Sequence, residues 1–324
     1  MEGSLRVSSA EQLADMFYRM GLIREFDSKL PALYDQGLVR GSSHAAIGQE
    51  AVAVGVCAAL QSSDYITSTH RGHGHTIAKG GDVNRMMAEL LGRESGYCRG
   101  KGGSMHIADF DIGMLGANGI VGGGIGICVG AGLSASVRAD GRVAVCFFGE
   151  GALNQGVFLE AANLAVIWSL PVVFVCENNH FAMSARVEHM IGVGDLTKRG
   201  EGVGMSSVVV DGMDVLAVYA AACDATTAAR RGDGPTLIVA DCYRFKGHFT
   251  ADPARYRSAD EVASWEARDP LSSFATRLEA DGVLSAAELA ALRERARLEV
   301  DRALERAKTA AMPSVQAAWE DVYA

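Results

Sequence analysis

Two polar turns carry the residues of this chain that are best suited to chemistry. Gly149-Glu150-Gly151 follows the apolar run 143–148, and Glu177-Asn178-Asn179 follows the apolar run 172–176. Short, uninterrupted apolar runs are typical of strands that are buried on both faces of a parallel sheet. Ligands of open parallel sheets bind beyond the carboxyl ends of the strands, so we expect both turns to line one binding site.

The residue types in the two turns indicate a site for a metal ion and a phosphate. Glycines on both sides of Glu150 allow a tight turn and close backbone approach, and the amides of the following helix can receive a phosphate. The Glu150 carboxylate and the amide oxygens of Asn178 and Asn179 are hard ligands, which magnesium takes in octahedral array together with substrate phosphates. The pattern therefore predicts a metal-bridged diphosphate between two adjacent strand ends.

Strands and helices alternate along the rest of the chain, and this alternation predicts an α/β fold with a mostly parallel sheet and helices on both faces. Periodicity and capping residues place the elements as follows: helices at 9–33, 49–60, 82–91 and 214–230, and strands at 65–69, 206–210 and 235–240. From Ser258 the chain is expected to be helical to its end, with capping boxes at Ser258 with Glu261 and at Ser285 with Glu288. No linker interrupts the chain, so we expect a single domain over 1–324.

Composition and charge exclude several classes of protein. The 324 residues are 49% apolar and carry a net charge of −9 without basic clusters, so nucleic acid and anionic membranes are not expected partners. The charge-free segment 119–137 contains seven glycines and fits a loop entering a helix better than a membrane span. The N-terminus lacks the profile of a signal peptide. The seven cysteines include no C-x-x-C pair, so we expect reduced, buried thiols in a cytoplasmic protein.

Three further polar or glycine-rich segments leave more than one interpretation open. His70, Arg71, His73 and His75 follow the expected strand at 65–69, where they would form a solvated loop, a zinc site or an anion site. The glycine-rich segments around 100–124 are equally explained by turn chemistry. The polar loop 242–257 is long enough to be functional or disordered, and a histidine alone in such a loop is usually just solvated.

The motifs taken together resemble a known family. Gly-Glu-Gly, 26 intervening residues and Asn-Asn are similar to the thiamine-diphosphate motif, which usually has Asp in place of Glu150. Five further motifs fit the same family: THRGHGHTIAKG (69–80), GKGGSMHIAD (100–109), GANGIVGGG (116–124), NQGVFLEAANLA (154–165) and YRFKGHFTADPARYR (243–257). The chain resembles, over residues 10–320, the alpha subunit of the thiamine-diphosphate-dependent component of 2-oxo acid and acetoin dehydrogenase complexes. The 70–80 and 247–257 segments look closer to acetoin than to pyruvate members.

The resemblance implies a role for particular residues. Magnesium would be held by the side chains of Glu150 and Asn179 and by the carbonyl of Phe181. The diphosphate and its neighbouring turn would involve His70, Arg71, Gly149, Gly151, Ala152 and Arg244, with His70 where pyruvate members more often have tyrosine. The backbone at Gly119 and Val121 would meet the aminopyrimidine ring, although Ile120 and Val121 could equally be core. His248 and His73 would contact substrate or transfer a proton, or serve only to position other groups.

The resemblance also implies a reaction and partners. Acetoin or a 2-oxo acid such as pyruvate would be cleaved, and the two-carbon acyl unit would pass to a lipoyl group on an acyltransferase. Thiamine chemistry needs a carboxylate against the aminopyrimidine ring. Glu50 has no motif support for that role, and in the family the carboxylate comes from a separate beta subunit in an α2β2 heterotetramer. The chain alone is therefore expected to be inactive.

Two other functions are compatible with parts of the sequence. The segment 130–135 fits G-x-G-x-x-A and would suit a nicotinamide-dependent dehydrogenase. However, the run before it is broken by glycines, and no carboxylate follows at the offset of about 20 residues expected of a ribose contact. A cofactor-impaired structural or regulatory homologue is the second alternative, because glutamate replaces the usual aspartate at position 150.

Overall fold

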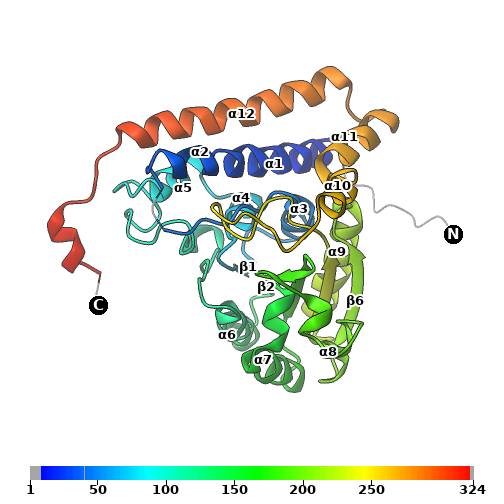
Figure 1. Ribbon diagram of the computed structural model, residues 1–324. Helices are drawn as coiled ribbons and strands as arrows, with labels where there is room; N and C mark the ends of the chain where they lie inside the picture. The colour runs from blue at the N-terminus through cyan, green and yellow to red at the C-terminus, as the bar shows by residue number, and fades with distance from the viewer. Residues whose placement is uncertain (1–8, 40, 322–324) are drawn as a thin grey trace.

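Five parallel strands form the sheet at the centre of the protein. The computed structural model describes residues 9–39 and 41–321. The strand order is β1-β2-β3-β7-β6, and every neighbouring pair is parallel. The strands are β1 (Tyr65–Thr67), β2 (Ala144–Gly149), β3 (Val172–Asn178), β6 (Ser206–Asp211) and β7 (Thr236–Asp241). The order of elements confirms the predicted α/β class (Figure 1).

Alternate side chains of the three central strands enter two separate apolar cores. Val145, Val173 and Ile238 face one core, to which the helices α1 (Ala10–Ser28), α3 (Glu50–Ala58), α4 (His73–Lys79) and α9 (Val215–Arg231) contribute. Cys146 and Phe174 face the other core, which is covered by α6 (Gly123–Arg138) and α7 (Gly156–Ile167) with the short α8 (Lys198–Glu201) beside them. Burial of both faces explains why the strands read as continuous apolar runs.

The C-terminal part adds a helical layer over α1. It consists of α10 (Ala259–Glu266), α11 (Pro270–Ala280) and α12 (Ala286–Thr309), followed by a 3₁₀ turn at Val315–Trp319. Figure 1 shows α12 lying along the outside of α1, and α12 also packs on α5 (Val83–Leu90). Ser285 and Glu288 form a reciprocal capping box at the start of α12, as predicted.

Two sequence predictions about helices were wrong in detail. The helix expected over 9–33 is divided at Lys29 into α1 and α2 (Leu30–Asp35). Pro31 lies in the first turn of α2; its ring lacks an N–H and cannot continue the preceding helix. The box expected at Ser258 is one-sided, because Ser258 accepts from the Glu261 amide while the Glu261 carboxylate pairs with Arg186.

Strand register places the two polar turns next to each other. Gly149 at the end of β2 pairs with Glu177 near the end of β3, and Glu177 pairs with Ala240 on β7. The three segments that follow these strands therefore begin at the same edge of the sheet. The predicted adjacency of the Glu150 and Asn179 turns is confirmed.

The predictions about cysteines and membrane spans agree with the structure. The seven cysteines form no disulfide in the described part of the chain, and five of them are buried: Cys57, Cys128, Cys146, Cys176 and Cys242. Burial raises the pKa of the Cys57 thiol to about 12, which keeps it protonated. Within 9–39 and 41–321, none of the helices is long and apolar enough to cross a membrane.

The contact between α3 and α9 gives a test of the packing. An alanine Cβ at Gly55 would lie 2.8 Å from the Val215 carbonyl oxygen, whereas one at Gly126 on α6 would meet nothing within 4 Å. We expect Gly55→Ala to lower the free energy of unfolding by about 1–3 kcal/mol through overpacking. The matched Gly126→Ala should raise it by about 0.5–1 kcal/mol through helix propensity. Urea unfolding followed by circular dichroism measures both, and an unchanged stability of Gly55→Ala would contradict the packing described.

Candidate functional site

A cavity of about 400 Å³ lies at the carboxyl edge of the sheet. It is formed where β2, β3 and β7 end, by the segment after β1 and by residues around 44–49 and 119–122. Almost all of the residues singled out in the sequence line it: His70, Arg71, Gly119, Val121, Gly149, Glu150, Gly151, Ala152, Asn179, Phe181, Arg244 and His248. His73, to which the resemblance gave a role, does not line the cavity, and neither do Asn178 and His75.

One end of the cavity offers oxygen atoms without protein partners. Glu150 is 1% exposed; one of its carboxylate oxygens accepts the Asn179 amide N–H at 3.2 Å, and the other has no partner among the described residues. The side-chain oxygen of Asn179 is likewise buried and unpartnered. Burial raises the pKa of the Glu150 carboxyl, against the charge of Arg244. Two unpaired oxygens in a buried place cost free energy unless a cation binds them, so the donor set fits a hard metal ion.

A strained hairpin fixes the position of Asn179. The residues that follow it form β4 (Phe181–Ala182) and β5 (Ala185–Arg186), and His180 and Met183 on the two sides of β4 have φ angles of 69° and 56°. Left-handed backbone at two non-glycine residues is uncommon and collects at functional sites. The Phe181 ring packs on Tyr243 and Tyr256, which anchors the hairpin to the segment after β7.

The other end of the cavity holds two buried guanidiniums. Arg71 donates from NH1 to the Ala45 carbonyl and from NH2 to the His248 carbonyl, the latter at 3.1 Å. Burial, with the charge of Arg244 added, lowers the pKa of Arg71 to about 9. Burial also lowers the pKa of Arg244. Two positive charges that share a buried space without a carboxylate bonded to either favour a polyanion beside them.

Protein partners hold Arg244 inside. Its guanidinium donates to the Met183 carbonyl at 2.9 Å and to the Tyr256 hydroxyl at 3.4 Å, and it meets His248 Nδ1 at 2.7 Å. Tyr256 in turn donates to Asp252 at 2.7 Å, and the Asp252 carboxylate accepts the His248 amide N–H. The loop 244–257 therefore has a closed hydrogen-bond network of its own, and His248 is not the freely solvated loop histidine that its sequence context alone would suggest.

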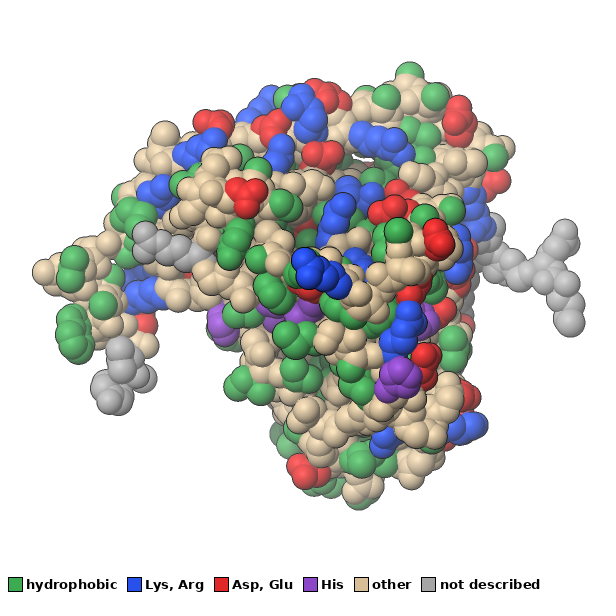
Figure 2. Space-filling model, in the orientation of Figure 1, with side chains coloured by type: hydrophobic (Ala, Val, Ile, Leu, Met, Phe, Trp, Pro, Cys, Tyr) green, Lys and Arg blue, Asp and Glu red, His purple; other side chains and the backbone are tan. Residues whose placement is uncertain are grey.

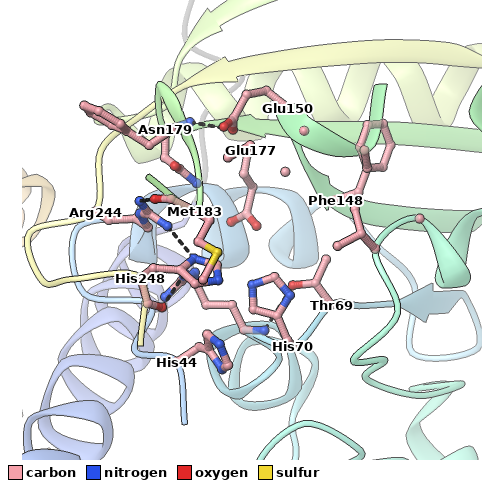
Figure 3. A pocket seen from close by; sticks show the side chains of 18 of the residues that line it. His44, Thr69, His70, Phe148, Glu150, Glu177, Asn179, Met183, Arg244 and His248 are labelled. Carbon is pink, nitrogen blue, oxygen red and sulfur yellow. Dashed lines mark hydrogen bonds between the residues drawn. The ribbon is translucent and has the colours of Figure 1, made fainter. Parts of the chain in front are cut away.

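Three imidazoles converge on the floor of the cavity. His44, His70 and His248 have ring centroids 4.5, 5.1 and 5.2 Å apart, and Figure 3 shows them below Arg244 and opposite Glu150 and Asn179. Burial first, and then the charge of Arg71, lowers their pKa values to about 2, 3 and 4 respectively. All three are therefore neutral near pH 7.

His73 lies behind the cavity wall. It is fully buried; its Nδ1 is 2.7 Å from an Asp27 carboxylate oxygen and its Nε2 is 2.9 Å from the Ser104 hydroxyl. Asp27 also accepts the Ala46 amide N–H, which fixes the segment that carries His44. This geometry supports the positional alternative for His73 and not direct contact with a substrate.

The histidine-rich segment after β1 is not a solvated loop, and its own histidines do not converge on one zinc site. His75 stacks on Phe147 with ring centroids 3.9 Å apart, and its Nε2 lies 3.4 Å from a Glu177 carboxylate oxygen. His70, His73 and His75 thus point to three different places. The sequence could not separate these orientations, because the segment enters helix α4 and successive side chains turn by the helical period.

Sequence reasoning missed several residues of the cavity. His44, Gln49, Glu177 and Met183 all line it. Glu177 precedes the two asparagines and so had a signal, whereas His44 and Gln49 come from a loop and a helix start that carry no phosphate or metal pattern. Both side-chain polar atoms of Gln49 are buried without partners in the described part of the chain, so Gln49 is equipped to bind a ligand.

The glycine-rich wall opens to the surface. Ile120 is 73% and Val121 is 50% exposed, so the alternative that they belong to the core is wrong. Gly122, with φ of 80°, forms the turn into α6. Figure 2 shows histidine and hydrophobic side chains gathered across the middle of this face, below the charged band over α1 and α12.

The fold and the site define a class of protein: an α/β protein whose cavity beyond adjacent strand ends is suited to a cation and a polyanion. The G-x-G-x-x-A segment 130–135 lies in the middle of α6 and not at a strand-to-helix turn, so no dinucleotide site is built there. Comparison with known families agrees with this class. Residues 18–316 match the model of the dehydrogenase E1 component, and the chain belongs to that family.

Several curated relatives are similar over nearly their whole length. The alpha subunit of acetoin:2,6-dichlorophenolindophenol oxidoreductase from Bacillus subtilis is 46% identical over 95% of this chain and 92% of its own. The subunit of that name from Cupriavidus necator is 42% identical over 97% of this chain and 94% of its own. The pyruvate dehydrogenase E1 component subunit alpha of Zymomonas mobilis is 43% identical over 94% of this chain and 86% of its own.

The two hydrogen bonds that Arg71 donates to backbone carbonyls give a test of the site. A lysine ammonium is a point charge that cannot reproduce the planar fork, so Arg71→Lys should loosen the 244–257 loop and lower the free energy of unfolding by about 1–3 kcal/mol. Limited proteolysis should cut this loop faster in the variant. Arg268→Lys is the matched control, because Arg268 makes a half-exposed ion pair with Asp211 that is worth about 0–1 kcal/mol. Equal cutting of Arg71→Lys and wild type would contradict the tether.

Proposed function

We propose that this chain is the alpha subunit of a thiamine-diphosphate-dependent dehydrogenase that cleaves acetoin or a 2-oxo acid such as pyruvate. The observation that carries the proposal is the pairing, across one cavity, of unpartnered oxygens on Glu150 and Asn179 with the buried guanidiniums of Arg71 and Arg244. A magnesium diphosphate matches both ends of this arrangement. Membership of the E1 family supports thiamine diphosphate as the molecule that carries it.

Different residues of the cavity would bind different parts of the cofactor. Glu150 and Asn179 would hold magnesium, with the Phe181 carbonyl as a third ligand. Arg71, Arg244 and His70 would bind the diphosphate, together with backbone at Gly149, Gly151 and Ala152. The glycine at 151 is required by space, since a Cβ there would lie 2.8 Å from the Ala182 Cβ. Gly119 and Val121 would meet the aminopyrimidine ring through their backbone.

The chemistry on the substrate needs an electron sink and controlled protons. Thiamine diphosphate, when bound, supplies the sink for the carbanion that C–C cleavage leaves. His248 and His70 are neutral imidazoles that can accept or pass a proton near the reacting centre. His73, through Asp27, would keep the segment with His44 in place.

A separate beta subunit is part of the proposal. Glu177 is a carboxylate in the cavity, but it is two residues from Asn179 and beside His75, so it belongs to the metal end of the site. The wall at 119–121 is exposed, and apolar side chains continue from it along α6 and α7: Ile127, Leu133, Val137, Leu159, Leu164 and Ile167. An extended apolar surface marks a protein interface. An α2β2 assembly that transfers the acyl unit to a lipoyl-bearing acyltransferase would complete the enzyme.

Neither alternative function gains support. Among the described residues the G-x-G-x-x-A segment has no phosphate-binding turn, and the Glu150 site retains its buried acceptors and opposing arginines. Calorimetry with thiamine diphosphate, with and without magnesium, separates the proposal from an impaired homologue, which would bind neither.

Activity and substrate can be tested together. Reduction of 2,6-dichlorophenolindophenol should be absent with the purified chain and should appear when a beta subunit of the family is added. Acetoin and pyruvate should be turned over in preference to branched 2-oxo acids, because each extra methylene in a fitted pocket changes selectivity by about 1–3 kcal/mol. Robust turnover by the single chain would refute the need for a partner.

Glu150 provides a test of the metal site. Glutamate adds one methylene between the turn and the ion, and magnesium tolerates little distortion from about 2.0–2.1 Å. Glu150→Asp should therefore tighten thiamine diphosphate binding in magnesium by up to about tenfold, if about 1.4 kcal/mol of strain is relieved. The gain should be smaller in calcium, which accepts longer and irregular contacts. Unchanged or weaker binding in magnesium would mean that the cavity is fitted to glutamate.

A further inference from the structure

Arg244 and His248 form a contact that the proposed binding role leaves unexplained. A guanidinium has only donors, so Arg244 NH1 donates to His248 Nδ1 over 2.7 Å. This bond holds the imidazole in its neutral form, with the proton on Nε2. The same guanidinium lines the cavity together with that of Arg71, so it is within reach of an anion that binds there. One side chain thus serves two acceptors that compete for it.

His248 lies among neutral imidazoles that could share a proton. The ring nitrogens of His44, His70 and His248 lie within 4.8 Å of one another. His44 is buried, and its Nδ1 has no hydrogen-bond partner in the part of the chain that the structure describes. An imidazolium at His248 has a second N–H to donate, and an unpartnered ring nitrogen such as His44 Nδ1 can accept it.

The charges that face this cluster are mostly positive. Arg71 donates to the backbone carbonyls of Ala45 and His248, and Arg244 bonds His248 directly. The remaining titratable groups around it are Asp252 and Tyr256 on the same loop, His73 behind His44, and Glu177 and Glu150 across the cavity. The balance of charge near His248 therefore changes sign only when an anion enters.

We propose that Arg244 acts as an anion-sensitive latch: a bound diphosphate takes over its guanidinium N–H, frees His248 Nδ1, and His248 then takes up a proton from solvent. The inference rests on the proposed function, because it assumes a diphosphate beside Arg71 and Arg244. One N–H···N bond is replaced by an N–H···O bond to phosphate, and one proton is added at Nδ1. The bound state thereby gains an acid in the cavity that the free state lacks.

The direction in which diphosphate changes the pKa of His248 follows from the causes that keep the ring neutral. Burial, Arg71 and Arg244 lower the pKa of His248 to about 4, and Asp252 opposes them. A diphosphate cancels both cationic contributions and adds attraction, and each opposite charge within about 4–6 Å raises a pKa by about 1–3 units. The pKa of His248 should therefore rise when a diphosphate binds. Protonation accompanies binding, so binding weakens as pH rises towards the raised pKa.

A metal ion is the competing use of the three imidazoles. Zinc takes histidine nitrogens, but a dication would lie beside two buried guanidiniums, which repel it strongly in a medium of low dielectric constant. An anion bound at the same place offsets the positive charge of the two guanidiniums. A single proton on His248 then meets less repulsion than a dication would. Zinc binding to the free chain, lost on removal of His248, would favour the metal and overturn the proposal.

Proton uptake can be measured by calorimetry. Inorganic diphosphate with magnesium is titrated into the full chain at about pH 6, near the usual pKa of histidine, in buffers of different ionisation enthalpy. The wild type should take up about 0.5–1 proton more than His248→Gln. Glutamine can still accept from Arg244, so the latch contact is kept while the titrating ring is lost. His189→Gln removes an exposed histidine outside the cavity and should match the wild type.

The outcomes separate this inference from the proposed function. Absence of diphosphate binding by the wild type would reject the proposed function, and the latch with it. Binding with equal proton uptake in wild type and His248→Gln would reject the latch alone. Should His248→Gln fail to fold, ¹⁵N spectra of the wild-type imidazoles decide: diphosphate should convert His248 from the Nε2–H form to the doubly protonated form, and an unchanged tautomer would overturn the proposal.

Discussion

The structure depends on a buried charge imbalance at one edge of a parallel sheet. Arg71 and Arg244 share the cavity with one carboxylate oxygen of Glu150 and the side-chain oxygen of Asn179, both without partners among the described residues. Burial disfavours the charged form of Arg71, Arg244 and Glu150. Buried charges and unpaired acceptors are costly, so such a site is stable in the fold only because the surrounding backbone carbonyls and the 244–257 network share the cost. A magnesium diphosphate, the ligand that we propose, would offset the imbalance at both ends together.

The rest of the molecule serves to hold these groups at fixed positions. Parallel register brings the ends of β2, β3 and β7 to one edge, and the two apolar cores pack on the two faces of these strands. Arg71 then joins the segment with His44 to the loop with His248, while the Asp27–His73–Ser104 chain supports that segment from behind. Rigid support of this kind is what a site needs if its groups are to act without reorganisation.

The incomplete character of the cavity explains why a partner is part of the proposed function. Residues of this chain line the ends proposed for the metal and the diphosphate, but the wall at Ile120 and Val121 is exposed and continues into the apolar outer face of α6 and α7. The edge strand β6 is also largely exposed, unlike the central strands. Similarity to alpha subunits of acetoin and pyruvate enzymes agrees with a chain that contributes one side of a shared site.

The sequence by itself determined the order of elements, the sheet class and most of the cavity. Apolar runs, glycine-flanked turns and capping residues are local signals, and β2, β3, α5, α9 and the cap of α12 follow from them. Local signals also placed Glu150 and Asn179, because both directly follow a strand.

Only the tertiary structure decided which histidines converge. His70, His73 and His75 are neighbours in sequence but point to the cavity, to Asp27 and to Glu177, whereas His44 and His248 come from distant segments to meet His70. The division of the first helix at Lys29 and the one-sided cap at Ser258 depended likewise on competing partners, Pro31 in the next turn and Arg186 across the fold. The helical period sets the direction of each side chain, but the partner that it meets depends on packing between segments, which spacing within one segment does not encode.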